Sequence, residues 1–70
     1  MSYSYQEQID RFAVELADES IQKKKNPEYK ESFTLENIAR SISSIYDVEY
    51  EKALKDLSYK KNLHFAKLVN

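Results

Sequence analysis

The chain has 70 residues, a formal net charge of -1, 33% charged residues, no glycine and no cysteine. This length allows one domain, spanning residues 1–70. With 41% hydrophobic residues and almost no net charge, the composition differs from that of a disordered chain, which has low hydrophobicity and a high net charge. The lack of cysteine excludes disulfides, thiol nucleophiles and thiolate metal sites, and the lack of glycine excludes the glycine-rich loops that hold phosphates.

The remaining polar residues do not suggest catalysis either. The single histidine, His64, cannot supply a zinc site, and we expect it to be a partly exposed tail residue rather than part of a triad. Glu15, Asp18 and Glu19 share a helix face, which we interpret as a solvated face because helix carboxylates alone make poor calcium sites. We therefore expect no enzyme, no metal, no cofactor and no small-molecule substrate.

Composition also bears on location and fold class. No apolar run approaches the roughly 18 residues of a membrane span, and no charged-then-apolar leader opens the chain, so we expect a cytoplasmic protein without membrane contact. Richness in Lys, Asn, Ile and Tyr is typical of an AT-rich genome, such as that of a low-GC bacterium or its phage. Tight hairpins depend on turns that contain glycine. The absence of glycine therefore favours an all-α fold.

The first helix is predicted over residues 5–25. Ser4 and Glu7 have the spacing of a capping box, in which each side chain bonds the other residue's amide. The end is marked by three consecutive lysines, which favour a helix C-terminus, and by Asn26-Pro27, which cannot continue the helix. Residues 27–32 then form a short connector turn.

The second helix is predicted over residues 35–46. Thr34 is a suitable N-cap, and Phe33 and Ile38 occupy the two positions of a hydrophobic staple. The apolar residues that follow recur at helical spacing up to Tyr46.

The third helix is predicted over residues 48–61, with Asp47 as its N-cap and Asn62 as its C-cap. Residues 62–70 are predicted to form an irregular apolar tail, since their pattern is neither clean helix nor clean strand. This tail either packs onto the first helix or takes part in self-association.

Together these predicted elements indicate an all-α fold, a small bundle of three main helices. A domain of this size buries only about 60% of its unfolded surface, so its stability is expected to be marginal and a dimer would add to it. The predicted core consists of Ile9, Phe12, Leu16, Leu35, Ile38, Ile42, Ile45, Leu54 and Leu57.

Two functional hypotheses remain. The six tyrosines are too many for so small a core, and exposed tyrosines favour a protein interface. We therefore expect a non-enzymatic module that acts by protein–protein interaction, either with a protein partner or with its own copy as a homodimer. The candidate interface residues are Tyr46, Tyr50, Tyr59 and Phe65.

The alternative is a helix-turn-helix-like DNA-binding transcriptional regulator that uses residues 34–57. The expected glycine is missing from the turn, and Asp47, Glu49 and Glu51 would bring acids to the start of the recognition helix, which disfavours phosphate contact. Nucleic-acid contact would then depend on Lys60 and Lys61. A second cluster of lysines lies at 23–25, and Lys67 adds to the first. If the first and third helices pack antiparallel, the two clusters lie at opposite ends; if they pack parallel, the clusters merge into one patch that, with Tyr59 and Phe65 nearby, could contact a nucleic-acid backbone.

Overall fold

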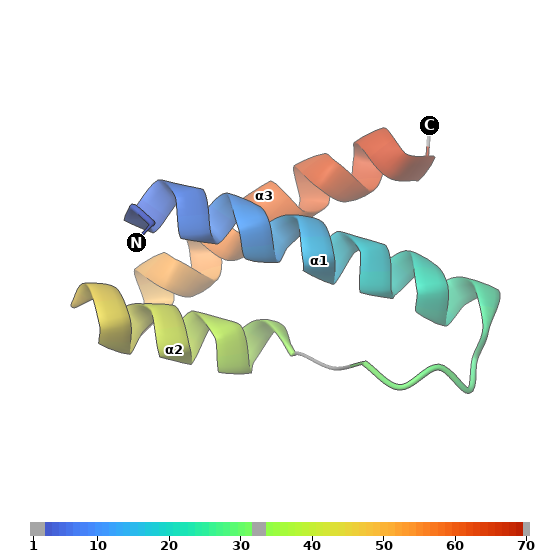
Figure 1. The fold of residues 1–70 in the computed structure, drawn as a ribbon, viewed down its shortest axis with the longest axis horizontal. Coiled ribbons are helices and arrows are strands. Elements are labelled where there is room, and N and C mark those ends of the chain that lie inside the picture. The colour runs from blue at the N-terminus through green and yellow to red at the C-terminus, as the bar shows by residue number, and fades with distance from the viewer. Residues whose placement is uncertain (1–2, 32–33, 70) are drawn as a thin grey trace.

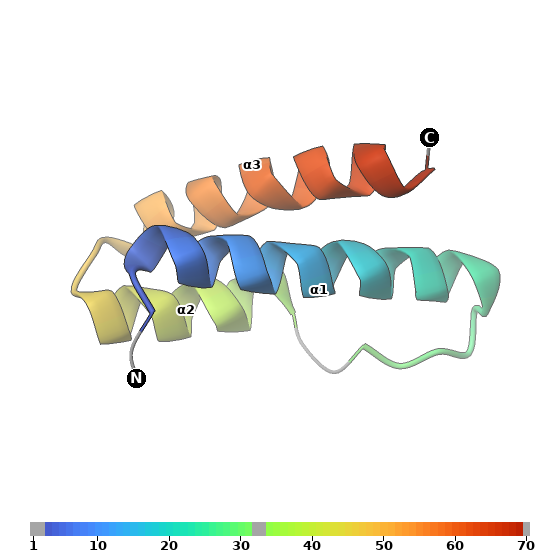
Figure 2. The ribbon, with the colours of Figure 1, turned by 45° about the horizontal axis from the view of Figure 1, so that its top comes forward.

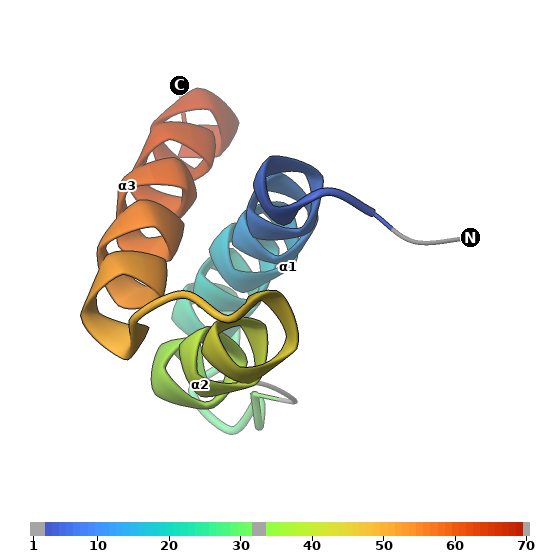
Figure 3. The same ribbon diagram turned by 90° about the vertical axis from the view of Figure 1, so that its left-hand side faces the viewer.

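The computed structural model describes residues 3–31 and 34–69 and contains three helices in the order α1 (Tyr5–Lys25), α2 (Leu35–Tyr46) and α3 (Tyr50–Val69). The described residues contain no strand, which confirms the all-α class. α1 and α3 run in the same direction, and α2 runs in the opposite direction beside their first halves (Figures 1 and 2). Seen from one end, the helices occupy the corners of a triangle (Figure 3).

Local caps explain why the first two helices lie where the sequence places them. The Ser4 hydroxyl accepts from the Glu7 amide at 3.2 Å, and the Ser4 amide donates to the Glu7 carboxylate at 3.0 Å. These hydrogen bonds lower the pKa of Glu7 and form the predicted capping box. At α2, the Thr34 hydroxyl accepts from the Asn37 amide at 3.2 Å. The staple expected from Phe33 lies outside the described residues.

The α2–α3 turn differs from the prediction. Asp47 does not cap α3; it ends α2 in the left-handed conformation, with φ 54° and ψ 47°. Aspartate tolerates this conformation better than most residues, so it fills the position for which glycine was expected. The Ser43 hydroxyl strengthens the turn by donating to the Val48 carbonyl at 2.6 Å. α3 consequently begins at Tyr50 rather than at residue 48.

The C-terminal tail is the largest correction. Residues 62–69 are helical and continue α3 without interruption, so Asn62 lies within the helix and is not its C-cap. This half of α3 extends past the first residues of α2 (Figure 2), and its contacts through His64 and Phe65 are with α1. It therefore needs only a narrow contact face, and its other apolar residues stay in solvent, which obscures the helical pattern in the sequence.

The core is formed by all three helices. Ile9, Leu16, Ile38, Ile42 and Leu57 are buried as expected, while Phe12, Leu35 and Leu54 are partly buried against them. Ile45 is 69% exposed, so its placement in the core was wrong: it lies one turn beyond Ile42, at the edge of the α2 stripe. The core also contains small residues that were not part of the predicted core, namely Ala13, Ala17, Ala39 and Ala53.

The solvated acidic face of α1 is confirmed only in part. Glu15 and Asp18 are exposed, but Glu19 is buried with 7% of its surface accessible. The connector after α1 folds back toward this position, where burial and the nearby charge of Glu19 raise the pKa of Tyr29.

Candidate functional site

The aromatic residues at the starting end of α1 pack against one another. Tyr5 and Tyr46 meet edge to face, with ring centroids 5.9 Å apart. The Tyr46 hydroxyl donates to the Tyr3 carbonyl at 2.7 Å, and the Arg11 guanidinium lies 4.1 Å from the Tyr3 ring centroid. Tyr46, which we predicted as an interface residue, thus holds the segment before α1 against the end of α2.

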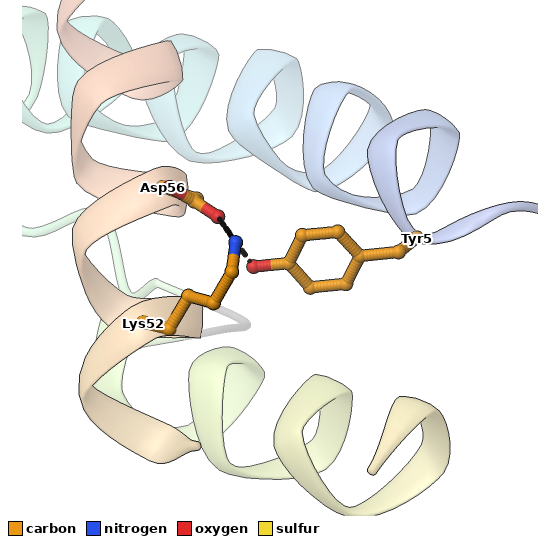
Figure 4. Close-up of polar contacts among 3 residues, drawn as sticks. All are labelled: Tyr5, Lys52 and Asp56. Carbon is orange, nitrogen blue, oxygen red and sulfur yellow. Dashed lines mark hydrogen bonds and ion pairs between the residues drawn. The ribbon is translucent and has the colours of Figure 1, made fainter. Parts of the chain in front are cut away.

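A polar network joins α1 to α3 at the same end (Figure 4). The Tyr5 hydroxyl donates to Oδ2 of Asp56 at 2.7 Å, and Nζ of Lys52 donates to the same oxygen at 2.8 Å. Burial, together with the hydrogen bond and negative charge of Asp56, raises the pKa of Tyr5 to about 12. The bonds from Lys52 and Tyr5 lower the pKa of Asp56. A phenol that stays protonated and a carboxylate that stays charged are poorly suited to acid–base catalysis at neutral pH.

The four predicted interface residues do not form one surface. Tyr46 and Tyr50 are half-buried near the α2–α3 turn, and the Arg40 guanidinium lies 5.8 Å from the Tyr50 ring centroid. Tyr59 is 63% exposed on the outer side of α3. Phe65 is half-buried near the other end, where Nζ of Lys24 lies 5.1 Å from its ring centroid.

α1 and α3 run parallel, so their C-terminal ends lie at the same end of the bundle (Figure 1). The contact between Lys24 and Phe65 connects the two helices there. Lys60 and Lys61, the residues predicted to contact nucleic acid, are both half-buried. Lys60 lies close enough to Asp10 for its charge to lower the pKa of that carboxyl.

His64 is part of the α1–α3 contact rather than of a tail. Its Nε2 lies 2.9 Å from Oδ1 of Asp10, and 21% of its side chain is exposed. This hydrogen bond is the main reason why the pKa of Asp10 is low, and the charges of Lys60 and Lys67 add to it. Residues 3–31 and 34–69 hold no group of three or more acidic, histidine or cysteine side chains placed to bind a metal ion.

An apolar groove between α1 and α2 was not predicted from the sequence. It has a volume of about 200 Å³ and opens to solvent beside Asn37, Ser41 and Ile45, all of which are exposed. No charged residue is among its lining residues, which are Gln8, Phe12, Asn37, Ile38, Ser41, Ile42 and Ile45. The only signal in the sequence was the position of Ile45 at the margin of the α2 stripe.

Comparison with protein-family models, with curated proteins and with solved structures finds no match to this chain. In the part of the chain that the structure describes, no helix is long and apolar enough to cross a membrane. The function of the chain must therefore be inferred from the surfaces of the molecule itself, and the α1–α2 groove is the strongest candidate among them.

Proposed function

We propose that this chain is a non-catalytic protein-interaction module that works as a homodimer, with the α1–α2 groove as the contact between the two copies. The observation that carries the proposal is Ile45, a large aliphatic side chain with 69% of its surface in solvent at the edge of an apolar groove. Covering apolar surface contributes roughly 25 cal/mol for each Å² removed from water.

The composition of the groove favours a second copy as its occupant. In a twofold dimer the same surface patch meets itself, so like charges near the axis would face each other. The groove lining contains no charged side chain, and its polar members are the neutral residues Gln8, Asn37 and Ser41. The groove lining itself therefore brings no like charges together when it meets a second copy.

The small core gives a second reason for dimerisation. Among the residues that the structure describes, the large side chains that are fully buried are Ile9, Ile42 and Leu57. Small domains with so little core are often stabilised by oligomerisation. A standard interface covers about 800 Å² on each partner, which is less than a sixth of the 5181 Å² that one copy exposes.

Sedimentation equilibrium across the micromolar range tests this proposal. We expect the wild type to approach twice the monomer mass of 8.3 kDa and Ile45→Glu to remain monomeric, because a charge in the groove would be buried in the dimer. Leu63→Glu is the matched control, since Leu63 is exposed on α3, away from the groove. Because both residues are exposed, circular dichroism should show unchanged helicity in both variants.

Three outcomes would overturn the homodimer. The first is a wild-type mass of 8.3 kDa at every concentration. The second is a dimer that Ile45→Glu leaves intact, and the third is a dimer that Leu63→Glu disrupts equally.

A further inference from the structure

The short segment before α1 contacts both α1 and α2. The hydroxyl of Tyr46, in the last turn of α2, donates to the Tyr3 carbonyl at 2.7 Å. The guanidinium of Arg11, on α1, lies 4.1 Å from the Tyr3 ring centroid, which is close enough for a cation–π contact. We call residues 3–4 the N-terminal strap, because they link the start of α1 to the end of α2. The strap leaves α1 on the side away from α3 (Figure 3).

The two side chains that hold the strap are neighbours of groove residues. Tyr46 directly follows Ile45, and Arg11 directly precedes Phe12. The first groove residue of α1, Gln8, comes one turn after the strap, and its backbone amide donates to the last carbonyl of the strap at 3.0 Å. The strap therefore lies at the end of the α1–α2 groove that carries Ile45.

The last turn of α2 depends on side-chain contacts to stay in place. Helix ends open more readily than helix centres, and this turn holds no cationic side chain that would complement the helix dipole. The Ser43 hydroxyl and the left-handed Asp47 hold the turn from its own side. From the side of α1, the ring of Tyr5 and the strap both contact Tyr46. Ile45 is 69% exposed, so its own side chain adds little to this anchoring.

We propose that the N-terminal strap positions Ile45 for the contact with the second copy, an inference that rests on the proposed homodimer. Tyr46 is the positioning residue, because its hydroxyl bonds the strap while the neighbouring Ile45 makes the contact. A binding surface that is already ordered before association loses less conformational entropy when it binds. The strap thus raises the affinity of the dimer without having to touch the second copy.

A strap that only stabilised the fold would behave differently. Losing its hydrogen bond would then lower the free energy of unfolding and leave the affinity between folded copies unchanged. If the strap positions Ile45, the same loss frees the last turn of α2, and folded copies bind each other less tightly. The two roles therefore differ in the dissociation constant of the dimer.

Sedimentation equilibrium of Tyr46→Phe tests the proposal, because this change removes the hydroxyl and keeps the ring that packs on Tyr5. We expect the Kd of the dimer to rise about 2- to 10-fold, the effect of one hydrogen bond. Tyr50→Phe is the matched control and should leave the Kd unchanged. Tyr50 is also half-buried near the α2–α3 turn, but its hydroxyl makes no hydrogen bond in the described structure.

Amide hydrogen exchange in the Ile45→Glu background measures the hold of the strap without dimerisation. Adding Tyr46→Phe to this background should speed exchange at the amides of residues 46 and 47 about 2- to 10-fold, since the last turn of α2 opens more often. Adding Tyr50→Phe instead should leave both amides unchanged.

The outcomes separate this proposal from the homodimer. A wild type that stays monomeric overturns the homodimer and, with it, this role of the strap. A wild-type dimer whose Kd is the same in Tyr46→Phe, or is raised equally by Tyr50→Phe, overturns the role of the strap and leaves the homodimer standing. Unchanged exchange at residues 46 and 47 would show that the strap does not hold the end of α2.

Discussion

Tyr5 shows how single residues hold this bundle together. Its ring packs on Tyr46 of α2, and its hydroxyl donates to Asp56 of α3 across 51 positions of sequence. One side chain of α1 thus contacts both other helices. The sequence places Tyr5 on the α1 stripe but cannot identify Asp56 as its partner, because that pairing depends on the direction in which α3 runs.

Replacing Tyr5 with phenylalanine removes the hydrogen bond and keeps the ring. We expect the free energy of unfolding to fall by about 0.5–1.5 kcal/mol, the net contribution of a typical hydrogen bond. Urea denaturation measures this loss. Tyr59→Phe is the control, since the exposed Tyr59 hydroxyl makes no hydrogen bond in the described structure; an equal loss in both variants would contradict the assigned role.

The same phenol predicts a loss of stability in alkali. Its pKa is 10.0 in the unfolded reference and about 12 in the folded chain. Between these values the folded state keeps a proton that the unfolded state has lost, so this contribution is complete below pH 10 and falls as the pH rises toward 12. Urea denaturation from pH 8 upward should show a steeper decline in the wild type than in Tyr5→Phe. Parallel profiles would show that Tyr5 has no such role.

At the scale of elements, the sequence predicts correctly those helix boundaries that depend on residues close to each other in the chain. α1 and α2 begin where predicted because their N-caps, Ser4 with Glu7 and Thr34 with Asn37, join residues only three positions apart. The end of α3 was missed because contacts with α1 stabilise that half of the helix, including those of His64 with Asp10 and Phe65 with Lys24. The groove was missed for the same reason, since it exists only once α1 and α2 are placed side by side.

The helical state of the last third of α3 can be tested at Ala66. This residue is exposed, so Ala66→Gly changes backbone preference without removing a packed side chain. Glycine in an exposed helix interior costs about 1 kcal/mol relative to alanine, and we expect a loss of that size in urea denaturation. Lys30→Gly in the connector should cost much less, and equal effects would contradict a continuous α3.

At the scale of the whole molecule, small residues set how closely the helices approach. Ala13 of α1 and Ala53 of α3 are fully buried in one cluster with Ile9 and Leu57. Alanines were not counted in the predicted core because their small side chains contribute little to an apolar stripe, yet the close contact between helices depends on them.

Enlarging one of these alanines should force the helices apart. We expect Ala13→Leu to lower the free energy of unfolding by about 1–3 kcal/mol, as overpacking does in dense cores. Val14→Leu adds one methylene group to the neighbouring exposed position and should change little. Urea denaturation of both variants measures these changes. If Ala13→Leu stabilised the protein, α1 and α3 would have to leave unfilled space at this position.

The triangular arrangement has a consequence for what a dimer would leave exposed. The outer side of α3 points away from the α1–α2 pair (Figure 3), so joining two copies through their grooves would leave α3 of each copy free. Such a dimer would carry two copies of any contact that α3 makes, held at a fixed distance from each other. Linked sites of this kind raise overall avidity by about 10²- to 10⁴-fold when the geometry lets both engage.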